Sequence, residues 1–289
     1  GASGVLLRQD ATGIINVDGT GAKGIIGTND ANIINDGIVN VNGAGSQGIY
    51  IERGATLTNT GQINVNGDGK IGVFIGMGSS FVNTAGITIS SGGTTVFDGG
   101  GTLANIGDIV IDGPTATVNG ITINNTGKIE ITGSLDFTGN ILLETTPGKA
   151  GTINVGGLSG TGHIILSPDA TLGNNYDMHH VQLLGGLSNP ETETIRVTSQ
   201  SVSFIAEKYF DKDLNSYVLT LTRIPYAQML KNTEAVEFGK GLDELHSKGP
   251  GDTEMDMFDA LKSVSDKDEL AETFDMQLRG NVYANIQQR

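Results

Sequence analysis

The acidic side chains of this sequence are the first candidates for chemistry, because polysaccharide lyases and glycosidases act through two or three clustered carboxyl groups. One series of polar residues recurs at steps of 24 or 22 positions: Asp18, Asn42, Asn66, Ser90 and Asp112. Only the two ends of this series are acids, so we expect their carboxyl groups to lie several repeats apart. Asp108 and Asp112 form an isolated acidic pair that flanks one strand. We interpret the series as a ladder of turn residues and assign catalysis to neither group.

The histidines are the second candidates, as ligands of a metal ion. The sequence has four histidines and no cysteine, and His163, His179 and His180 are the nearest to a cluster. Adjacent side chains of a strand point to opposite faces of the sheet, so His179 and His180 could not bind one ion from a strand. We predict a pair of loop histidines and no metal centre.

Three segments are partly similar to calcium-binding loops. The run from Asp211 to Asn215 begins like an EF-hand loop, but Ser216 replaces the glycine of the sharp turn and Thr222 replaces the bidentate glutamate. The glycine-rich segments 66–69 and 99–102 resemble calcium-binding nonapeptides, yet their setting in a 24-residue step does not match such a repeat. We interpret the first segment as the polar tip of a β-hairpin and the others as turns.

The remaining glycine-rich motif lies at residues 76–80, Gly-Met-Gly-Ser-Ser. It lacks the lysine of a phosphate-binding loop and falls between two predicted strands. The sequence has no Gly-x-Ser-x-Gly nucleophile motif, and its four histidines offer little for a Ser-His-Asp triad. We therefore predict that the chain is not an enzyme and has no catalytic, cofactor-binding or metal-binding residues.

The composition predicts a chain of many short strands and turns. Among 289 residues, 44 are glycine, 6 are proline, none is tryptophan, and 17% are charged. The 32 acidic and 17 basic residues give a net charge of -15, which repels nucleic-acid phosphates and anionic bilayers, so a nucleic-acid partner is not expected. No apolar run approaches the roughly 20 residues of a membrane-spanning helix. No signal peptide opens the sequence, so we expect any targeting segment to lie outside it.

An internal repeat with steps of 20 to 24 residues predicts the fold. In the strand at residues 13–17, alternation places Ile15 and Val17 on one face and Asn16 on the other. One inward column consists of Ile15, Val39, Ile63, Ile87, Ile109, Ile129 and Ile153. Its companion column consists of Val17, Val41, Val65, Ile89, Ile111, Ile131 and Val155.

Two further apolar columns and a column of asparagines keep the same steps. The apolar columns are Ile33, Leu57, Phe81, Leu103 and Ile123, and Ile25, Ile49, Val73 and Phe97. Two residues after each member of the first stands an asparagine: Asn35, Asn59, Asn83, Asn105 and Asn125. We place these asparagines at corners, where asparagine tolerates left-handed backbone and can bond neighbouring turns. Three short strands per repeat predict a mostly-β, right-handed parallel β-helix with about 20–25 residues per rung.

The pattern divides the chain into three predicted regions. Residues 1–155 are regular β-helix repeats, and residues 156–225 are a less regular end with a hairpin at 202–224 that caps the open coil. After Pro225 the apolar period becomes about 3.6, so residues 226–289 are predicted to be amphipathic helices. Candidate N-caps are Asp252, Thr253 and Ser265. The apolar helix positions are Val236, Gly239, Leu242 and Leu245, then Phe258, Leu261 and Val264, then Leu270, Phe274, Leu278, Val282 and Ile286.

Taken in order, these features resemble the passenger domains of autotransporters, the type V secreted proteins of Gram-negative bacteria. The glycine-rich repeats resemble the passenger β-helix, Leu-Ser-Gly-Thr-Gly at 158–162 resembles a motif frequent in such passengers, and the hairpin is similar to their autochaperone end. Residues 273–287 are similar to the pattern that precedes the membrane barrel in that family. Arg279 takes the place of the usual serine and Asn281 that of the usual glutamate.

The resemblance implies the membrane-proximal fragment of a large surface adhesin, followed by an outer-membrane β-barrel outside this sequence. The expected function is a structural stalk and folding module at the bacterial cell surface, which presents distal binding regions in host-cell or intercellular adhesion and in virulence. The expected partners are that barrel, the periplasmic and outer-membrane assembly machinery, and a host cell-surface protein or glycan bound mainly through a distal region. Two alternatives stay open: a carbohydrate-active β-helix enzyme, as a polysaccharide lyase or glycosidase, and a self-associating aggregation protein.

Overall fold

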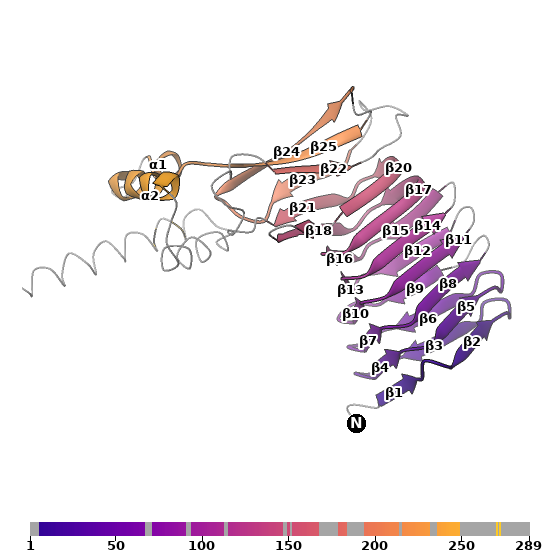
Figure 1. The fold of residues 1–289 in the computed structure, drawn as a ribbon. Coiled ribbons are helices and arrows are strands. Elements are labelled where there is room, and N and C mark those ends of the chain that lie inside the picture. Colours follow the sequence, from indigo (N-terminus) through magenta and orange to yellow (C-terminus); the bar gives the residue numbers. More distant parts are fainter. Residues whose placement is uncertain are drawn as a thin grey trace, which may run out of the picture.

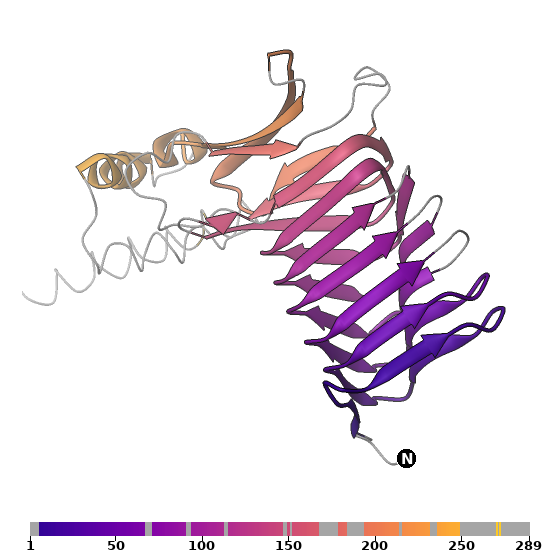
Figure 2. The ribbon, with the colours of Figure 1, turned by 45° about the vertical axis from the view of Figure 1, so that its right-hand side comes forward.

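The computed structural model describes residues 6–66, 71–90, 94–112, 115–146, 149–150, 152–167, 179–183, 194–213, 216–231, 236–248, 270 and 272. Most of these residues lie in short parallel strands that stack rung upon rung into a solenoid (Figures 1 and 2). The predicted parallel β-helix is therefore confirmed. None of the described helices is long and apolar enough to cross a membrane.

The first face of the solenoid is a straight stack of nine parallel strands. They are β1 (Leu6–Gln9), β4 (Asn32–Asn35), β7 (Thr56–Asn59), β10 (Ser80–Asn83), β13 (Thr102–Asn105), β16 (Thr122–Asn125), β18 (Asn140–Thr146), β21 (His163–Ser167) and β23 (Arg196–Ser199). Their pairing shows no shift of register from one strand to the next. The short β19 (Lys149–Ala150) pairs antiparallel with the end of β18.

The second and third faces form one continuous sheet because two long strands bend across both of them. These long strands are β17 (Lys128–Phe137) and β20 (Thr152–Gly160). The second face also contains β2 (Ile14–Val17), β5 (Ile38–Val41), β8 (Gln62–Asn66), β11 (Gly86–Ser90) and β14 (Asp108–Asp112). The third face also contains β3 (Lys23–Gly27), β6 (Gln47–Ile51), β9 (Ile71–Ile75), β12 (Thr94–Gly99) and β15 (Thr115–Asn119).

Apolar side chains fill the interior in the columns that the alternation predicts. The two columns of the second face keep their register from Ile15 and Val17 to Ile153 and Val155. The columns that begin at Ile33 and Ile25 are confirmed as well. Each rung buries its side chains against the rungs before and after it, so one hydrophobic cluster runs along the solenoid.

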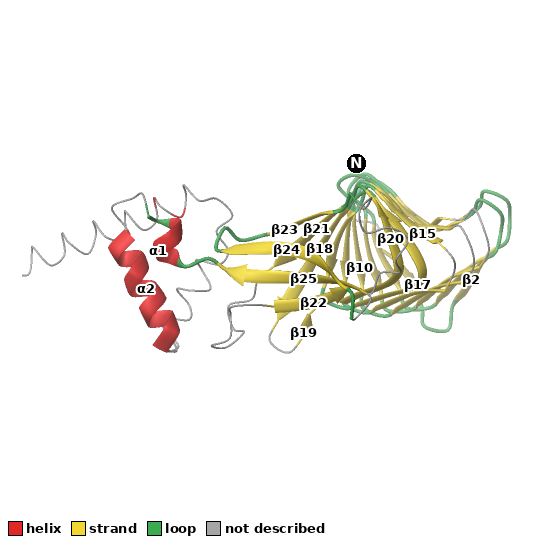
Figure 3. Ribbon diagram, turned by 90° about the horizontal axis from the view of Figure 1, so that it is seen from above, coloured by secondary structure: helices red, strands yellow, loops and turns green. Residues whose placement is uncertain are grey.

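Three antiparallel strands cover the C-terminal end of the solenoid, which confirms the predicted cap hairpin. They are β22 (His179–Leu183), β24 (Phe204–Asp211) and β25 (Ser216–Arg223), with β25 in the centre. Leu219 and Leu221 of β25 are fully buried in the hydrophobic cluster of the solenoid, and Phe204 and Phe210 of β24 pack against it. Viewed along the solenoid, these strands and the helices that follow extend to one side of the coil (Figure 3).

In the described part of the chain after Pro225, two helices contribute to a second, smaller hydrophobic cluster. They are α1 (Tyr226–Met229) and α2 (Val236–Lys248). The buried members of the cluster are Tyr226, Met229, Leu230, Leu242 and Leu270. Phe238 and Leu245 of α2 pack against them, so Phe238 rather than the predicted Val236 belongs to the apolar face. The predicted helices beyond residue 248, with their candidate caps Asp252, Thr253 and Ser265, lie outside the described residues except for Leu270 and Glu272.

Candidate functional surfaces

The series that begins at Asp18 is a ladder along the turn between the second and third faces. Asn42 Nδ2 donates to Asp18 Oδ1 at 2.8 Å, and Asn66 Nδ2 donates to Asn42 Oδ1 at 2.9 Å. At its other end the Thr132 hydroxyl donates to Asp112 Oδ1 at 3.0 Å. Asp18 and Asp112 stand four rungs apart, or about 19 Å at roughly 4.8 Å per rung. Paired carboxyl groups of glycosidases lie only about 5–10 Å apart, so these two acids cannot act together.

Asp108 belongs to a group of exposed charges on the second face. It lies in register beside Lys128 of the next rung, and Lys128 forms an ion pair with Glu130. The pKa of the Lys128 ammonium is raised, mainly by its hydrogen bond with Glu130 and the charge of that carboxylate, with a smaller contribution from Asp108. These contacts stabilise charged side chains at a solvated surface.

His163 of β21 has both ring nitrogens engaged. Its Nε2 lies 2.7 Å from the Thr198 hydroxyl, and its Nδ1 lies 3.1 Å from Nη2 of Arg196. Burial, and then the positive charge of Arg196, lower the pKa of the imidazole, so the neutral form accepts a bond from the guanidinium. This ring has no lone pair left for a metal ion. Among the residues that the structure describes, no three His, Cys, Asp or Glu side chains are grouped to hold one.

His179 and His180 lie on a strand, so the prediction of a loop pair is wrong. Both belong to β22, where His179 pairs with Leu221 and His180 with Thr220 of β25. The reason is that β25, the buried centre of the cap, offers a second edge for an antiparallel strand. The sequence around the two histidines lacks the repeat that predicts strand pairing elsewhere in the chain.

The glycine-rich and acidic loops form turns of the fold. At the hairpin tip the Asp213 N–H donates to Asp211 Oδ1 at 2.9 Å. Residues 76–79 of the glycine-rich motif form the corner between β9 and β10, where Gly78 has a φ of 75°, and Ser80 begins β10. At the same corner of the following rung, between β12 and β13, the N–H groups of Gly100 and Gly101 both donate to Ile75 O, at 3.0 and 2.8 Å. Residues 67–69 of the remaining candidate loop lie outside the described part of the chain.

The column of asparagines that begins at Asn35 forms a buried chain of amide groups at the corner between the first and second faces. Its members are Asn35, Asn59, Asn83, Asn105 and Asn125, all 0% exposed. Each Nδ2 donates to Oδ1 of the next asparagine, at 2.7, 2.9, 2.9 and 2.8 Å in chain order. The expected left-handed backbone is absent from these five residues, because they end regular strands. Asn29, Asp30 and Arg53 have positive φ instead, at the corner between the third and first faces.

The ends of this asparagine ladder differ from its middle. Asn83 receives a bond from Asn59, donates to Asn105, and also donates to Ala85 O at 3.0 Å. Asn125 is the last member, since Leu143 takes its position in the next rung. Its neighbour Asn105 also has Lys128 O within 3.4 Å of Nδ2, which can serve that donor when Asn125 is changed.

Replacement of Asn83 by leucine is expected to lower the free energy of unfolding by about 1–3 kcal/mol more than the same change at Asn125. In Asn83→Leu the Oδ1 of Asn105 loses the bond that it accepts from Asn83, whereas Asn125→Leu leaves the Nδ2 of Asn105 with Lys128 O. Urea unfolding of the two variants followed by circular dichroism measures the difference. Equal losses would mean that the ladder bonds contribute nothing beyond the volume of the side chains.

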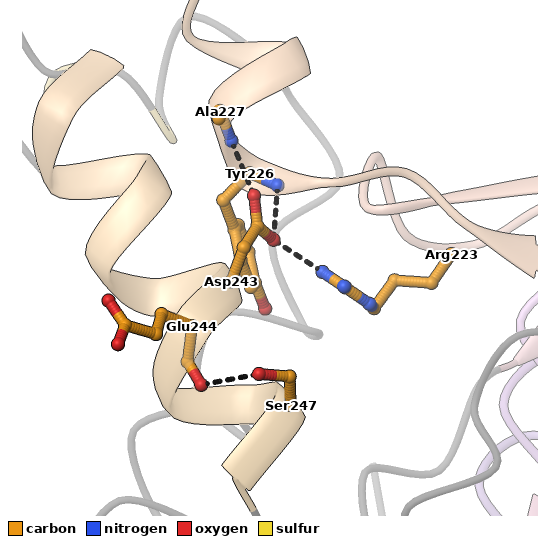
Figure 4. Close-up of polar contacts among 6 residues, drawn as sticks. All are labelled: Arg223, Tyr226, Ala227, Asp243, Glu244 and Ser247. Carbon is orange, nitrogen blue, oxygen red and sulfur yellow. Dashed lines mark hydrogen bonds and ion pairs between the residues drawn. The ribbon is translucent and has the colours of Figure 1, made fainter.

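A polar junction joins the cap sheet to the helices, and sequence reasoning missed it. Asp243 of α2 accepts a bond from Arg223 Nη1 at 2.8 Å and from the N–H groups of Tyr226 and Ala227 at 2.9 and 3.0 Å (Figure 4). Asp243 thus satisfies backbone donors at the start of α1 and the charge at the end of β25 together. The one sequence signal for this junction is Gly239, a poor helix former one turn before Asp243, which indicates a close approach of another segment to the helix.

Gly239 permits this contact because it lets α2 approach the backbone of α1. A Cβ atom at this position would lie 2.9 Å from the Tyr226 carbonyl carbon and from the Ala227 nitrogen. Both atoms belong to the backbone and cannot move aside, so any larger residue would push α2 away. The carboxylate of Asp243 would then lose its bonds to α1.

The ring of Tyr50, which stacks on Phe74 of the third face, is a poor platform for sugars. The two rings stack with centroids 4.7 Å apart and 9° between their planes. The ammonium of Lys23 lies 3.2 Å from the centroid of Tyr50. Both faces of the Tyr50 ring are therefore occupied by side chains of the same molecule, which leaves neither for a sugar ring.

The chain was compared with protein-family models, with curated proteins and with solved structures, and none of them matches it. Its functional features are therefore those of its own geometry. They are the stacked interior columns, the closed C-terminal end and the junction at Asp243.

Proposed function

We propose that this chain is the stalk and C-terminal folding module of an autotransporter passenger at the bacterial cell surface. Two observations carry the proposal together: a solenoid whose first face keeps its register over nine strands, and a closed C-terminal end. The first face alone stacks nine strands, which at about 4.8 Å each make a rod roughly 40 Å long. Such a rod holds a distal host-binding region away from its anchor.

Stiffness follows from the way in which the rungs are joined. Each rung contacts only its neighbours, and it does so through backbone bonds, apolar columns and the buried amide chain together. Most interior residues are valine or isoleucine, whose β-branched side chains have few rotamers. The side chains in the interior therefore have little conformational freedom. A stalk requires this property, whereas an enzyme of similar fold requires a cluster of carboxyl groups on one face.

The closed end supports the role of a folding module. Leu219 and Leu221 cover the last apolar columns, and the Asp243 junction fixes the cap to α1 and α2. An ordered rung presents free backbone groups to the next one, so a completed cap is a template from which rungs can add toward the N-terminus. In this proposal the cap folds first and its growth helps to draw the passenger out through its outer-membrane barrel, after delivery by the periplasmic assembly machinery.

Deletion of residues 202–224 is expected to remove most of the surface-exposed passenger, because the solenoid end loses its cover and its template. The chain would be joined to an outer-membrane barrel, and exposure would be measured by antibody labelling and by protease access on intact cells. The matched control replaces Ile205 and Tyr209 by serine, since both side chains are exposed on the outer side of β24. Unchanged display after the deletion would contradict the folding role.

The alternative of a carbohydrate-active enzyme is supported less well. The acids of the Asp18 ladder stand about 19 Å apart, and Glu130 of the second face is held in a surface ion pair with Lys128. A host glycan or protein remains a partner that we assign to distal regions. The charge of -15 disfavours a nucleic acid as a partner of this part.

A further inference from the structure

The far face of the Phe74 ring is the open end of the aromatic stack on the third face. The hydroxyl of Tyr50 donates to Glu52, so the Tyr50 ring leans along its strand toward the corner that follows it. The Phe74 ring is nearly parallel to the Tyr50 ring, with its centroid 4.7 Å away, or about one rung spacing, and therefore leans the same way. Its second face is turned toward β12 of the next rung, which pairs with β9.

The next rung leaves space beneath this ring. The residue in register with Phe74 is Asp98, and it is followed by Gly99 and Gly100, which have no side chains. Among the described atoms, only Cγ and Sδ of Met77 lie within 4 Å of the place where a Cβ of Gly100 would stand. Met77 is 82% exposed, so it borders the space without closing it. We call this space, bounded by Phe74, Asp98, Gly100 and Met77, the Phe74 notch.

The groups around the Phe74 notch are those that bind a positive charge. The face of an aromatic ring attracts cations, and a thioether is polarizable. Asp98 Oδ1 accepts a bond from Asn119 Nδ2 at 2.9 Å, which orients the carboxylate and leaves lone pairs for a further donor. The opposite end of the stack already holds such a charge, because the Lys23 ammonium lies 3.2 Å from the Tyr50 centroid.

We propose that the Phe74 notch binds the ammonium group of a lysine side chain of a partner protein. A lysine ammonium is compact and has three donors, so it can lie on the Phe74 ring and donate to the Asp98 carboxylate at the same time. The net charge of -15 attracts basic partners to this chain. The site goes beyond the stalk proposal and does not depend on it.

A single notch binds one lysine weakly, since an ion pair and a ring contact at a solvated surface each contribute little. We expect a dissociation constant of roughly 1–30 mM for one lysine side chain. The partner protein gains further affinity from the contacts that surround that lysine.

NMR of the whole chain, labelled at the methyl carbon of methionine, measures this binding at the notch itself. The sequence has 6 methionines, and the signal of Met77 is identified by its loss in Met77→Leu. The probe is N-acetyl-lysine amide, titrated to about 100 mM at constant ionic strength. The matched probe is the same compound acetylated on its side chain, which removes the charge. Only the charged probe is expected to shift the Met77 signal in a saturable way.

The first test variant is Gly100→Leu, which fills the notch without any change of charge. Gly100 does not share the positive φ of Gly99, so its backbone accepts a side chain, and Met77 is flexible enough to move aside. The variant is expected to bind the lysine probe at least about tenfold more weakly, because the leucine occupies the place of the ligand.

The second test variant is Asp98→Asn, with Asp112→Asn as its matched control. Each change removes one negative charge from a carboxylate that ends a ladder of polar side chains, Asp98 with Asn119 and Asp112 with Thr132. Asp98→Asn is expected to weaken binding at least about threefold, because the ammonium loses its carboxylate. Asp112→Asn is expected to leave it unchanged.

Equal weakening in the two asparagine variants would overturn the proposal, because attraction to the whole acidic chain would then explain the shift. Unchanged binding in Gly100→Leu, or an equal shift of Met77 by the acetylated probe, would overturn it as well. If circular dichroism shows that Gly100→Leu does not fold, Phe74→Leu takes its place, because it removes the ring and keeps the charge. That variant is expected to bind at least about threefold more weakly.

Choline, added in place of the lysine probe, tests the source of the ammonium group. Tighter binding of choline than of the lysine probe would overturn the assignment to a protein lysine. Each of these outcomes leaves the stalk proposal intact, because display of the passenger requires no contact at the Phe74 notch.

Discussion

Replacement of Phe81 by alanine is expected to lower the free energy of unfolding by about 3–5 kcal/mol. Phe81 is fully buried, and it lies in register between Leu57 and Leu103 of the neighbouring rungs. Alanine would leave a cavity that the stacked backbones cannot close, because each rung is held at the strand spacing by its bonds to the next. Urea unfolding followed by circular dichroism measures the loss.

The control for Phe81→Ala is the change of Val82 to alanine in the same strand. Val82 lies on the outward side of β10 and is only half-buried, so its loss is expected to be below about 1 kcal/mol. Similar losses for the two variants would mean that the interior column is not the main source of stability in this rung. The comparison also tests the assignment of inward and outward positions directly.

Replacement of Asp243 by alanine is expected to cost about 2–4 kcal/mol and to release α2 from the cap. The change removes the carboxylate that pairs with the Arg223 guanidinium, and among the described residues the Nε of Arg223 already lacks a hydrogen-bond partner. The side chains of Arg223 and Asp243 are 13% and 21% exposed, so the expected loss lies below that of a fully buried pair. Hydrogen exchange of the amides of Tyr226 and Ala227, which bond to Asp243, measures the release.

The next residue provides a matched control for the Asp243 variant. Glu244 points away from the junction (Figure 4) and forms an exposed ion pair with Lys248, with both side chains more than half exposed. Glu244→Ala is expected to change stability by no more than about 0.5 kcal/mol. If the amides of α1 are equally well protected from hydrogen exchange in both variants, Asp243 does not hold the two helices together.

The solenoid could be predicted from the sequence because its contacts repeat at nearly constant steps. Ile63 faces Val39 and Ile87 for the same reason that Ile109 faces Ile129, and alternation within each strand identifies the inward side. Even the shorter steps of 22 and 20 residues preserve the pattern, since the change of length falls in the loops and not in the strands. The asparagine column was found by the same rule.

The cap could be predicted only in part because its contacts do not repeat. The hairpin of β24 and β25 is local, and its polar tip announces it. The pairing of His180 with Thr220 joins segments 40 residues apart without a shared period, so β22 was missed. The bond from Arg223 to Asp243 joins a strand to a helix and depends on the close approach at Gly239, which no pattern of polar and apolar residues encodes.

The conformation of the buried asparagines was misjudged for a related reason. Asparagine in a glycine-rich repeat suggests a turn with left-handed backbone, because the side chain can bond to nearby backbone. In the structure the amide groups of Asn59 and Asn83 instead satisfy each other across rungs, and also bond to Gly61 O and Ala85 O. The stacking of identical residues therefore decides their role, while the preference of the single residue does not.

Surface display of the Asp243→Ala and Phe81→Ala variants from the same outer-membrane barrel is the most direct test of the proposed stalk and folding module. The two changes remove similar free energies, about 2–4 and about 3–5 kcal/mol. They differ in place, because Asp243 lies in α2 beyond the cap and Phe81 lies in β10, the fourth strand of the first face. If the passenger folds outward from its C-terminal end, Asp243→Ala lowers the amount of surface-exposed chain by more than Phe81→Ala does, although it is no more destabilising. Equal display of the two variants, or a greater loss for Phe81→Ala, would contradict folding from the capped end.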